Sequence, residues 1–316
     1  MPQSLTVALA QIAPIWLDRE RTLDKMIHQT GKAAQQGAQL IAFGEALLPG
    51  YPFWLEPTHA ANFNDPIQQD LHAHYLDQAV QIEAGHLDRL REACADHQIA
   101  AYVGCIERPQ DRAGHTAYCS LVYIDPRGEI QSVHRKLMPT YEERLSWGIG
   151  DGHGLRTHSL GDFTVGGLNC WENWMPMARA TMYAQGVNVH IAVWPGGPHN
   201  TQDITRFIAQ EGRTYVLSVS GLMRQSDIGD PLPHADLIRQ HTGDWLARGG
   251  SCIAAPDGSW LVEPVNDREE LLVAALDLAE VRKARQNFDP SGHYARPDVF
   301  QLKVDRKRQG MVDFGE

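Results

Sequence analysis

Cys170 occupies a position suited to a nucleophile. It follows an apolar strand expected at 163–168 and precedes a helix expected at 177–185. A strand, a tight bend that carries the reactive residue and then a helix form the elbow found in other enzymes with a covalent nucleophile. A helix that begins nearby would also help to lower the pKa of the thiol. Polar and aromatic neighbours distinguish Cys170 from the other four cysteines, which we interpret as small buried apolar residues.

Two charged residues follow other expected strands in the same manner. Glu45 comes after a strand at 38–43, and Lys136 comes after a strand at 129–133. A carboxylate at the end of a buried strand needs a partner or a chemical role, and an ammonium group can stabilise an anion that forms during a reaction. Taken singly, Glu45 has the ordinary alternative of a solvated or capping residue, and Lys136 that of one charge in a charged loop. We therefore weigh the three residues as one candidate site.

Hydrophobic periodicity predicts the elements that would position these residues. Strands are expected at 5–12, 38–43, 99–106, 118–124, 129–133, 163–168, 187–193, 215–220, 251–255 and 260–265. Helices are expected at 18–36, within 71–97 as one or two segments, at 177–185, around 204–213 and briefly after 279. Pro/Asp/Gly turns at 125–128 and 256–259 predict two hairpins. The mixture of βαβ units and hairpins predicts an α/β protein with mixed sheets covered by helices.

The chain shows no linker rich in Pro, Gly or Ser between these elements. We therefore expect one domain over residues 1–280. The remaining residues, 281–316, form a C-terminal extension rich in Arg, Lys and Pro, which we expect to pack on a partner subunit.

Composition excludes several classes of partner. The 316 residues carry 28 Lys and Arg against 39 Asp and Glu, a net charge of −11. Such acidity disfavours nucleic acid and anionic membrane surfaces, both of which need a basic face. No apolar run approaches the ~18 residues that span a bilayer, and residues 1–14 lack the features of a secretory signal. Five widely spaced cysteines without a CxxC pair argue against disulfides or a zinc site, so we expect a cytoplasmic protein.

Motifs of competing enzymes are missing from the sequence. There is no GxSxG motif and no HExxH motif, so the sequence indicates neither a serine hydrolase nor a zinc peptidase. The motifs around papain-like and caspase-like cysteines do not occur either. The glycines at 152–154 and 196–197 fit neither a dinucleotide-binding loop nor a P-loop.

Taken together, the clusters around Glu45, Lys136 and Cys170 resemble the nitrilase (carbon–nitrogen hydrolase) superfamily. The resemblance is closest to true nitrilases and covers essentially the whole chain. It is carried by the segments RKLMPT at 135–140 with ER at 143–144, WGIGDG at 147–152, CWENWMP at 170–176 and GHYARPD at 292–298. Four such segments in the correct order are far more specific than any one of them.

The resemblance implies a fold, a chemistry and a set of roles. The fold would be a four-layer αββα sandwich. Cys170 would be the nucleophile, Glu45 the general base, Lys136 the stabiliser of the anionic intermediate and Glu143 a second glutamate that orients the site. The reaction would convert an organic nitrile to a carboxylic acid and ammonia with no cofactor and no metal. Family members dimerise and often form larger assemblies through their C-terminal regions, so a homodimer or larger homo-oligomer is expected.

Substrate preference is harder to read from the sequence. The substrate-binding candidates lie beside the clusters: Tyr51, Thr140, Tyr141, Trp147, Trp171 and Trp194. If several of these aromatic residues line the pocket, an aromatic or arylaliphatic nitrile is expected. Two alternatives stay open: the same residues acting on cyanide or an amide, and a non-catalytic binding or assembly protein that kept the fold.

Overall fold

Two β-sheets lie face to face in the computed structural model, which describes residues 3–312. One sheet has the strand order β13 (Glu270–Asp277), β1 (Ser4–Gln11), β2 (Leu40–Phe43), β3 (Ala100–Glu107), β4 (Tyr118–Ile124) and β5 (Ile130–Arg135). The other has the order β10 (Leu222–Arg224), β11 (Trp245–Ala254), β9 (Tyr215–Ser220), β8 (Val189–Trp194), β7 (Phe163–Asn169) and β6 (Thr157–Leu160), with β12 (Trp260–Asn266) paired to β11.

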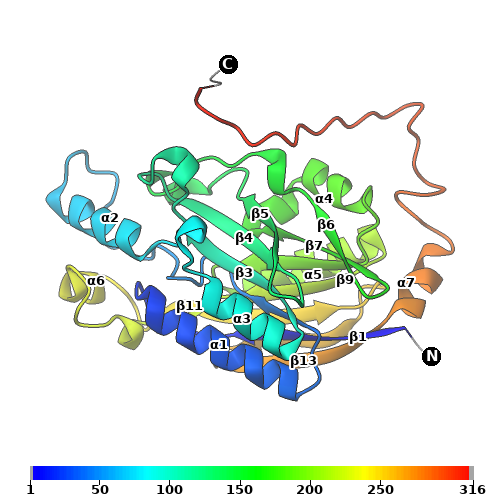
Figure 1. The fold of residues 1–316 in the computed structure, drawn as a ribbon, viewed down its shortest axis with the longest axis horizontal. Coiled ribbons are helices and arrows are strands. Elements are labelled where there is room, and N and C mark those ends of the chain that lie inside the picture. The colour runs from blue at the N-terminus through cyan, green and yellow to red at the C-terminus, as the bar shows by residue number, and fades with distance from the viewer. Residues whose placement is uncertain (1–2, 313–316) are drawn as a thin grey trace.

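Helices cover the outer face of each sheet, which confirms the expected four-layer αββα sandwich (Figure 1). Helices α1 (Arg19–Gln35) and α3 (Asp88–His97) pack on the first sheet, and α4 (Pro176–Tyr183) and α5 (Pro198–Gly212) pack on the second. Strand residues alternate between the layers, because successive side chains of a strand point to opposite faces. Val7 and Leu9 of β1 join the core between the sheets, whereas Ala8 lies under the helices.

A separate apolar cluster closes one end of the sandwich. It contains α2 (Pro66–Gln78), α6 (Ala235–Gln240) and the segment that follows β2. Ala46, directly after Glu45, belongs to this cluster together with Tyr75 of α2 and Ile238 of α6. The cluster therefore shields the end of β2, where the first candidate residue lies, from solvent.

Most expected elements are present, and the differences have local causes. Segment 71–97 divides into α2 and α3, and α2 already begins at Pro66. Helix α5 begins at Pro198, six residues before the expected start, because proline is well suited to the first turn of a helix. Strand β11 begins at Trp245 instead of Ser251. Strands β6, β10 and β13 were not expected; the first two are only four and three residues long.

After α7 (Leu278–Arg285), the described part of the tail has no helix or strand and runs along the surface (Figure 1). Near its end it contacts its own chain, because the Arg308 guanidinium and the Gln309 amide both donate to the Asp151 carboxylate at 2.9 and 3.0 Å. Residues 313–316 of the expected extension, like residues 1–2, lie outside the described residues. Packing of this tail on a partner subunit stays a prediction.

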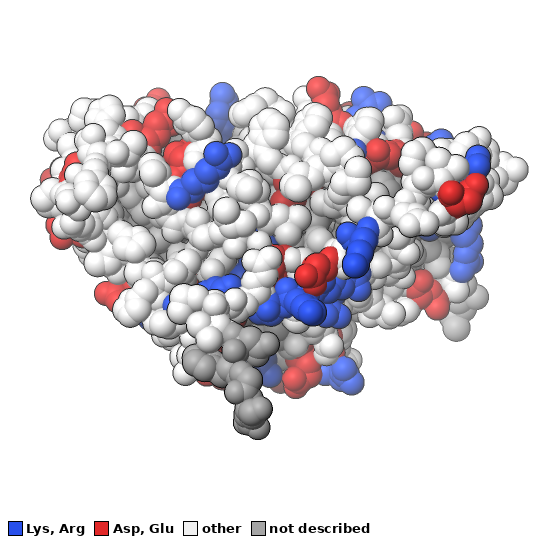
Figure 2. All heavy atoms as spheres, turned by 90° about the horizontal axis from the view of Figure 1, so that it is seen from above, with Lys and Arg blue, Asp and Glu red and all other residues white. Residues whose placement is uncertain are grey.

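The face shown in Figure 2 is largely neither acidic nor basic, and one group of Lys and Arg side chains gathers below its centre. Within residues 3–312, no helix combines the length and the apolar character needed to cross a membrane.

Strand β3 approaches the segment that carries Glu45 very closely at Gly104. A Cβ atom at position 104 would lie 2.0 Å from the Gly44 carbonyl oxygen and 2.9 Å from the Glu45 Cα atom. Both neighbours are backbone atoms, so any larger residue must displace the chain on which Glu45 stands.

We therefore expect Gly104→Ala to lower the free energy of unfolding by about 1–3 kcal/mol, the usual effect of overpacking. Urea unfolding measures the change. The matched control is Gly243→Ala, because a Cβ atom there meets nothing within 4 Å. Equal stability of the two variants would contradict the close approach.

Candidate active site

The ends of three strands bring the predicted residues together. Glu45 follows β2 by two residues, Lys136 follows β5 directly, and Cys170 follows β7 directly. Because β2 and β5 belong to one sheet and β7 to the other, the three side chains meet where strand ends of the two sheets come together. The Cys170 sulfur, one carboxylate oxygen of Glu45 and one of Glu143 lie within 4.8 Å of one another.

Lys136 lies between two carboxylates. Its Nζ atom is 2.8 Å from Glu45 Oε1 and 2.7 Å from Glu143 Oε2, and all three side chains are buried. Burial alone would lower the pKa of the ammonium, but the charges of Glu45, Cys170 and Glu143 outweigh it and raise that pKa well above its ordinary value. The ammonium is therefore a permanent positive charge at this position.

Glu143 accepts three hydrogen bonds. Besides Lys136, the Tyr51 hydroxyl donates to Oε1 at 2.9 Å and the Thr140 amide donates to Oε2 at 2.6 Å. Glu143 lies in the short 3₁₀ helix Tyr141–Leu145, and the Thr140 contact closes a capping box at the start of that helix. Three donors fix the carboxylate and, through it, the position of the lysine ammonium.

Glu45 has the electrostatic character of a base that works near neutral pH. Burial raises the pKa of its carboxyl to about 7, although Lys136 lowers it, and Glu143 adds a further increase. Its Oε1 atom is held by Lys136, and the Cys119 thiol donates to the same atom at 3.5 Å. Among the described residues, its Oε2 atom has no hydrogen-bond partner.

Cys170 lies on the tight bend that the sequence predicts. Its φ of 46° is in the left-handed region, which a residue other than glycine adopts only at some cost in energy. A short 3₁₀ helix, Cys170–Trp174, begins at the nucleophile candidate itself, but burial outweighs its help and raises the pKa of the thiol well above its ordinary value. Lys136 and the Trp171 amide lower that pKa without reversing the shift. Deprotonation of this thiol therefore requires a base.

A buried carboxylate, Glu172, joins the segment of Lys136 to the segment of Cys170. Its oxygens accept hydrogen bonds from the Leu137 amide at 2.5 Å and the Asn169 amide at 2.7 Å. His134 Nε2 lies 3.0 Å from the same carboxylate. Burial would raise the pKa of Glu172, but His134 and the two amides lower it. Leu137, just after Lys136, and Asn169, just before Cys170, are thus both bound to the Glu172 carboxylate.

Asn173 stabilises the other side of the bend at Cys170. Its side-chain amide donates to the Leu168 carbonyl at 3.2 Å and to the Cys170 carbonyl at 2.9 Å. Its oxygen lies 2.8 Å from His190 Nε2, and burial lowers the pKa of His190 to about 3, so this histidine is neutral and donates. The strained backbone at Cys170 is therefore held by side chains on both sides.

The predicted substrate-binding residues divide into two groups. Tyr51, Thr140 and Trp147 lie at the charged cluster: the first two contact Glu143, and the Trp147 ring lies 5.4 Å from Lys136 Nζ. Trp147 also meets Tyr51 edge to face at 5.4 Å between ring centres. These three residues can form part of a wall beside the reacting atoms.

The other three candidates point elsewhere. Tyr141 is 79% exposed, and Trp171 is 49% exposed and stacks on Trp174. Trp194 is fully buried, donates to the Ser218 hydroxyl at 3.3 Å and packs in the core cluster that also contains Cys170. The structure does not bring these three side chains to the carboxylates.

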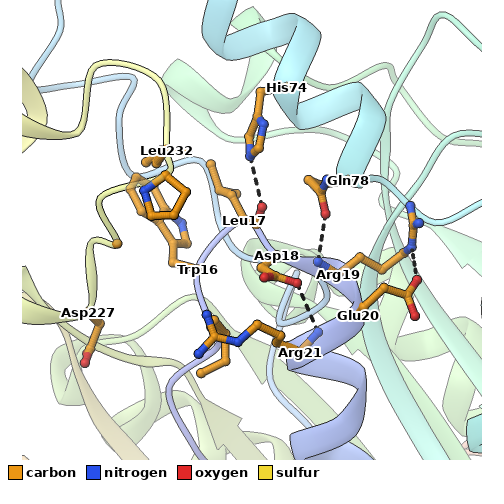
Figure 3. Close-up of a pocket in the computed structure, with 13 residues that line it drawn as sticks. Trp16, Leu17, Asp18, Arg19, Glu20, Arg21, His74, Gln78, Asp227 and Leu232 are labelled. Atoms are coloured by element: carbon orange, nitrogen blue, oxygen red, sulfur yellow. Dashed lines mark hydrogen bonds and ion pairs between the residues drawn. The ribbon is translucent and has the colours of Figure 1, made fainter.

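Two cavities lie in the neighbourhood of the loops around the site. A groove of about 770 Å³ is lined by residues 55–56 and 59–62 and by the neighbours of Glu143, which are Tyr141, Glu142, Arg144 and Leu145. A smaller pocket of about 290 Å³ lies at the start of α1 and includes none of the candidate catalytic residues (Figure 3). Its polar groups largely pair with one another, as where Arg19 binds Gln78 and Glu20.

The carboxylates and thiol of this site also form a set of atoms able to bind a metal ion. The Lys136 ammonium, however, already supplies the cation for both carboxylates at hydrogen-bond distance. The ammonium therefore occupies the position between the two carboxylates that a metal cation would take.

Sequence reasoning missed three contributors to the site. The sequence could have indicated His134, because it lies two residues before Lys136 and alternate residues of a strand point to the same face. Glu172 lies inside the segment CWENWMP, but the sequence alone assigned it no separate role. Cys119 was interpreted as a buried apolar residue; it is buried, but its thiol contacts Glu45.

Comparison with known proteins defines the class. A model of the carbon–nitrogen hydrolase family matches residues 6–286, so this chain belongs to that family. It is a hydrolase that acts on carbon–nitrogen bonds.

Relatives place the chain within the nitrilase superfamily. It is 35% identical to Nitrilase 2 from an unknown prokaryotic organism over 98% of this chain and 95% of that one. It is also 35% identical to an aliphatic nitrilase from Rhodococcus rhodochrous, covering 98% and 81% of the two chains. A bifunctional nitrilase/nitrile hydratase from Nicotiana tabacum is 33% identical, covering 98% and 89%. Nitrilase-type hydrolysis is thus the activity that the relatives support.

Solved structures share the fold. A carbon–nitrogen hydrolase from Helicobacter pylori G27 has a TM-score of 0.72 at 19% identity, covering 94% of this chain and 97% of that one. An amidase from Nesterenkonia sp. has a TM-score of 0.64 at 18% identity, covering 88% and 92%.

The Glu172 contacts predict a pH-dependent contribution to stability. Glu172→Gln keeps the size of the side chain but replaces one acceptor oxygen with an NH₂ group that faces a backbone amide. We expect the free energy of unfolding at pH 7 to fall by about 1–3 kcal/mol. Because the pKa of Glu172 is lowered in the folded protein, the contribution is complete above the ordinary carboxyl pKa and is lost as the pH falls through the folded value.

Urea unfolding at neutral and acidic pH measures this difference. Glu129→Gln is the control, since that side chain is 61% exposed. A destabilisation by Glu172→Gln that is no larger than that of the control would refute the role of the buried carboxylate.

Proposed function

We propose that this enzyme hydrolyses an organic nitrile to the carboxylic acid and ammonia, with Cys170 as nucleophile, Glu45 as general base and Lys136 as stabiliser. The observation that carries the proposal is the buried cluster in which the Lys136 ammonium touches both Glu45 and Glu143 beside the Cys170 sulfur. The relatives named nitrilase support the substrate class.

The first half of the reaction forms a covalent intermediate. The Cys170 thiol gives its proton to Glu45, and the sulfur attacks the nitrile carbon. The triple bond becomes a C=N bond, its nitrogen takes up the proton that Glu45 accepted from the thiol, and a thioimidate results. Lys136 donates a hydrogen bond to that nitrogen while negative charge develops on it, an effect worth about 3–4 kcal/mol for a single well-placed donor.

The second half releases the products. A water molecule that loses a proton to Glu45 adds to the thioimidate carbon and gives a tetrahedral intermediate. Glu45 returns that proton to the nitrogen of the intermediate. The C–N bond then breaks as the hydroxyl proton moves to the nitrogen, which releases ammonia and leaves a thioester on Cys170. A second water then cleaves the C–S bond, which yields the carboxylic acid and restores the thiol. Glu45 takes and returns a proton in each half, a role that suits a carboxyl whose pKa is about 7.

The same residues are chemically able to act on cyanide or on an amide, since both present an electrophilic carbon bound to nitrogen. A solved structure that shares this fold is named as an amidase, so an amide is the alternative substrate class to test. For the organic substituent, only Tyr51 and Trp147 of the predicted aromatic residues lie at the charged cluster. An aromatic or arylaliphatic preference therefore has less support than the sequence suggested, and three of the relatives are named aliphatic nitrilases.

We also propose a homodimer or larger assembly in the cytoplasm. The exposed apolar side chains of the segment after the nucleophile and of α5 support a subunit interface: Trp171, Trp174, Met175, Met177 and Phe207. The five cysteines are all unpaired thiols, which suits a reducing compartment.

A substrate panel tests the proposed reaction. Aliphatic, arylaliphatic and aromatic nitriles, cyanide and amides are each incubated with the enzyme, and ammonia is measured. We expect ammonia from at least one organic nitrile, and we expect Cys170→Ala to reduce the rate by about 10³-fold or more. Cys94→Ala, which changes a buried thiol of α3 outside the cluster, is the matched control.

Three results would contradict the proposal. Turnover of amides alone would make the enzyme an amidase, and undiminished ammonia release by Cys170→Ala would refute the nucleophile. No release from any compound by the folded wild-type protein would favour a binding or assembly protein.

The pKa of Glu45 predicts the pH dependence of the reaction. A general base must be deprotonated, so kcat/KM should fall as the pH drops below about 7. Lys136 stays charged through this range because its pKa is raised, so the acid limb reports the Glu45 cluster as a whole. Initial rates over a series of buffers, with circular dichroism as a check of folding, measure the limb. A rate that stays constant down to about pH 5 would be inconsistent with this base.

A further inference from the structure

We propose that Cys119 is a positioning residue for the general base: its thiol holds Oε1 of Glu45 and leaves Oε2 as the oxygen that receives protons. The inference rests on the proposed function, because it concerns the same site. It adds a second cysteine with a role distinct from that of the nucleophile.

The first support is the direction of the Cys119 side chain. Cys119 lies in β4, in the same sheet as β2 and β5, and it is buried. Its thiol donates to Glu45 Oε1 at 3.5 Å, a normal length for a hydrogen bond from sulfur. Its backbone carbonyl accepts the Lys136 amide at 2.7 Å. One residue therefore touches both the base and the chain segment of the cation.

The second support is the difference between the two oxygens of Glu45. Oε1 has two donors, the Lys136 ammonium at 2.8 Å and the Cys119 thiol. Oε2 is fully buried and has no partner within residues 3–312. A buried carboxylate oxygen without a donor is costly unless it serves a reacting group. The Cys170 sulfur lies within 4.8 Å of one carboxylate oxygen of Glu45. Because Oε1 already has two donors, Oε2 is the oxygen left to take the proton of the thiol.

The remaining charged and titratable groups at Glu45 do not supply this contact. Lys136 bridges Glu45 to Glu143, and Tyr51 donates to Glu143. The Tyr75 hydroxyl, buried on α2, donates instead to the Gly50 carbonyl. Among these neighbours, only Lys136 and Cys119 donate to Glu45.

The thiol contact has an electrostatic consequence with a definite sign. A donor to a carboxylate stabilises its charged form, so the Cys119 hydrogen bond lowers the pKa of Glu45 against the larger effect of burial. Removal of the donor should raise that pKa and move the acid limb of the reaction to higher pH. Serine keeps a donor at this position, and alanine does not.

The test compares Cys119→Ala, Cys119→Ser and Cys105→Ala. Cys105 is a matched control, because it is a buried thiol on the neighbouring strand β3 with no thiol hydrogen bond among the described residues. We expect the acid limb of kcat/KM to move up by about 0.5 pH unit in Cys119→Ala, and to stay within about 0.2 unit of wild type in the other two variants. A residue with a purely structural role would change stability without moving the limb.

A second readout separates this proposal from the proposed reaction. Alkylation of Cys170 by iodoacetamide, followed by peptide mapping, reports loss of the thiol proton without any substrate turnover. If wild type releases no ammonia from any compound, the proposed function fails, and the alkylation profile still tests Cys119. The proposal is overturned if Cys119→Ala leaves the pH dependence unchanged in either assay, that of kcat/KM or that of Cys170 alkylation. The same upward shift in Cys119→Ser or in Cys105→Ala also overturns it, because loss of the donor would then not be the cause.

Discussion

Lys136 is held between two buried carboxylates, Glu45 and Glu143, and the rest of the site depends on this interaction. An ammonium group this deeply buried would lose its charge without anionic neighbours, and two carboxylates this close would repel each other without the ammonium. The three groups therefore stabilise one another's positions and charges. They also leave one carboxyl, that of Glu45, with a pKa of about 7, where it can exchange protons in neutral solution.

The fold serves this cluster by bringing the ends of two sheets together. Glu45 and Lys136 stand on the first sheet and Cys170 on the second, so the spacing between the proposed nucleophile and the proposed base depends on how the sheets pack. Glu172 bridges the two sheets directly, since it binds the amide after Lys136 and the amide before Cys170. A small shift between sheets would otherwise separate the reacting groups, and catalysis is sensitive to displacements of this size.

Burial shifts the pKa of Cys170 and the pKa of Glu45 in the same direction, and the proposed chemistry depends on both shifts. It raises the pKa of the Cys170 thiol and the pKa of the Glu45 carboxyl, so the thiol stays protonated until a base of suitable strength takes its proton. The short 3₁₀ helix that begins at Cys170 does not reverse this shift, because burial is the larger effect. The amide of Trp171 and the Lys136 charge oppose the shift locally.

The sequence by itself determined most of the strands along the chain, the two hairpins and the position of Glu45, Lys136 and Cys170 after strand ends, because hydrophobic periodicity and turn residues are local signals. The resemblance then supplied the αββα fold and the place of Glu143. Only the tertiary structure decided which side chains touch. The Cys119 thiol on Glu45, the Glu172 bridge and the outward position of Trp171 depend on residues far apart in the chain. The pKa values likewise depend on burial and on charges that arrive through folding, which no local pattern encodes.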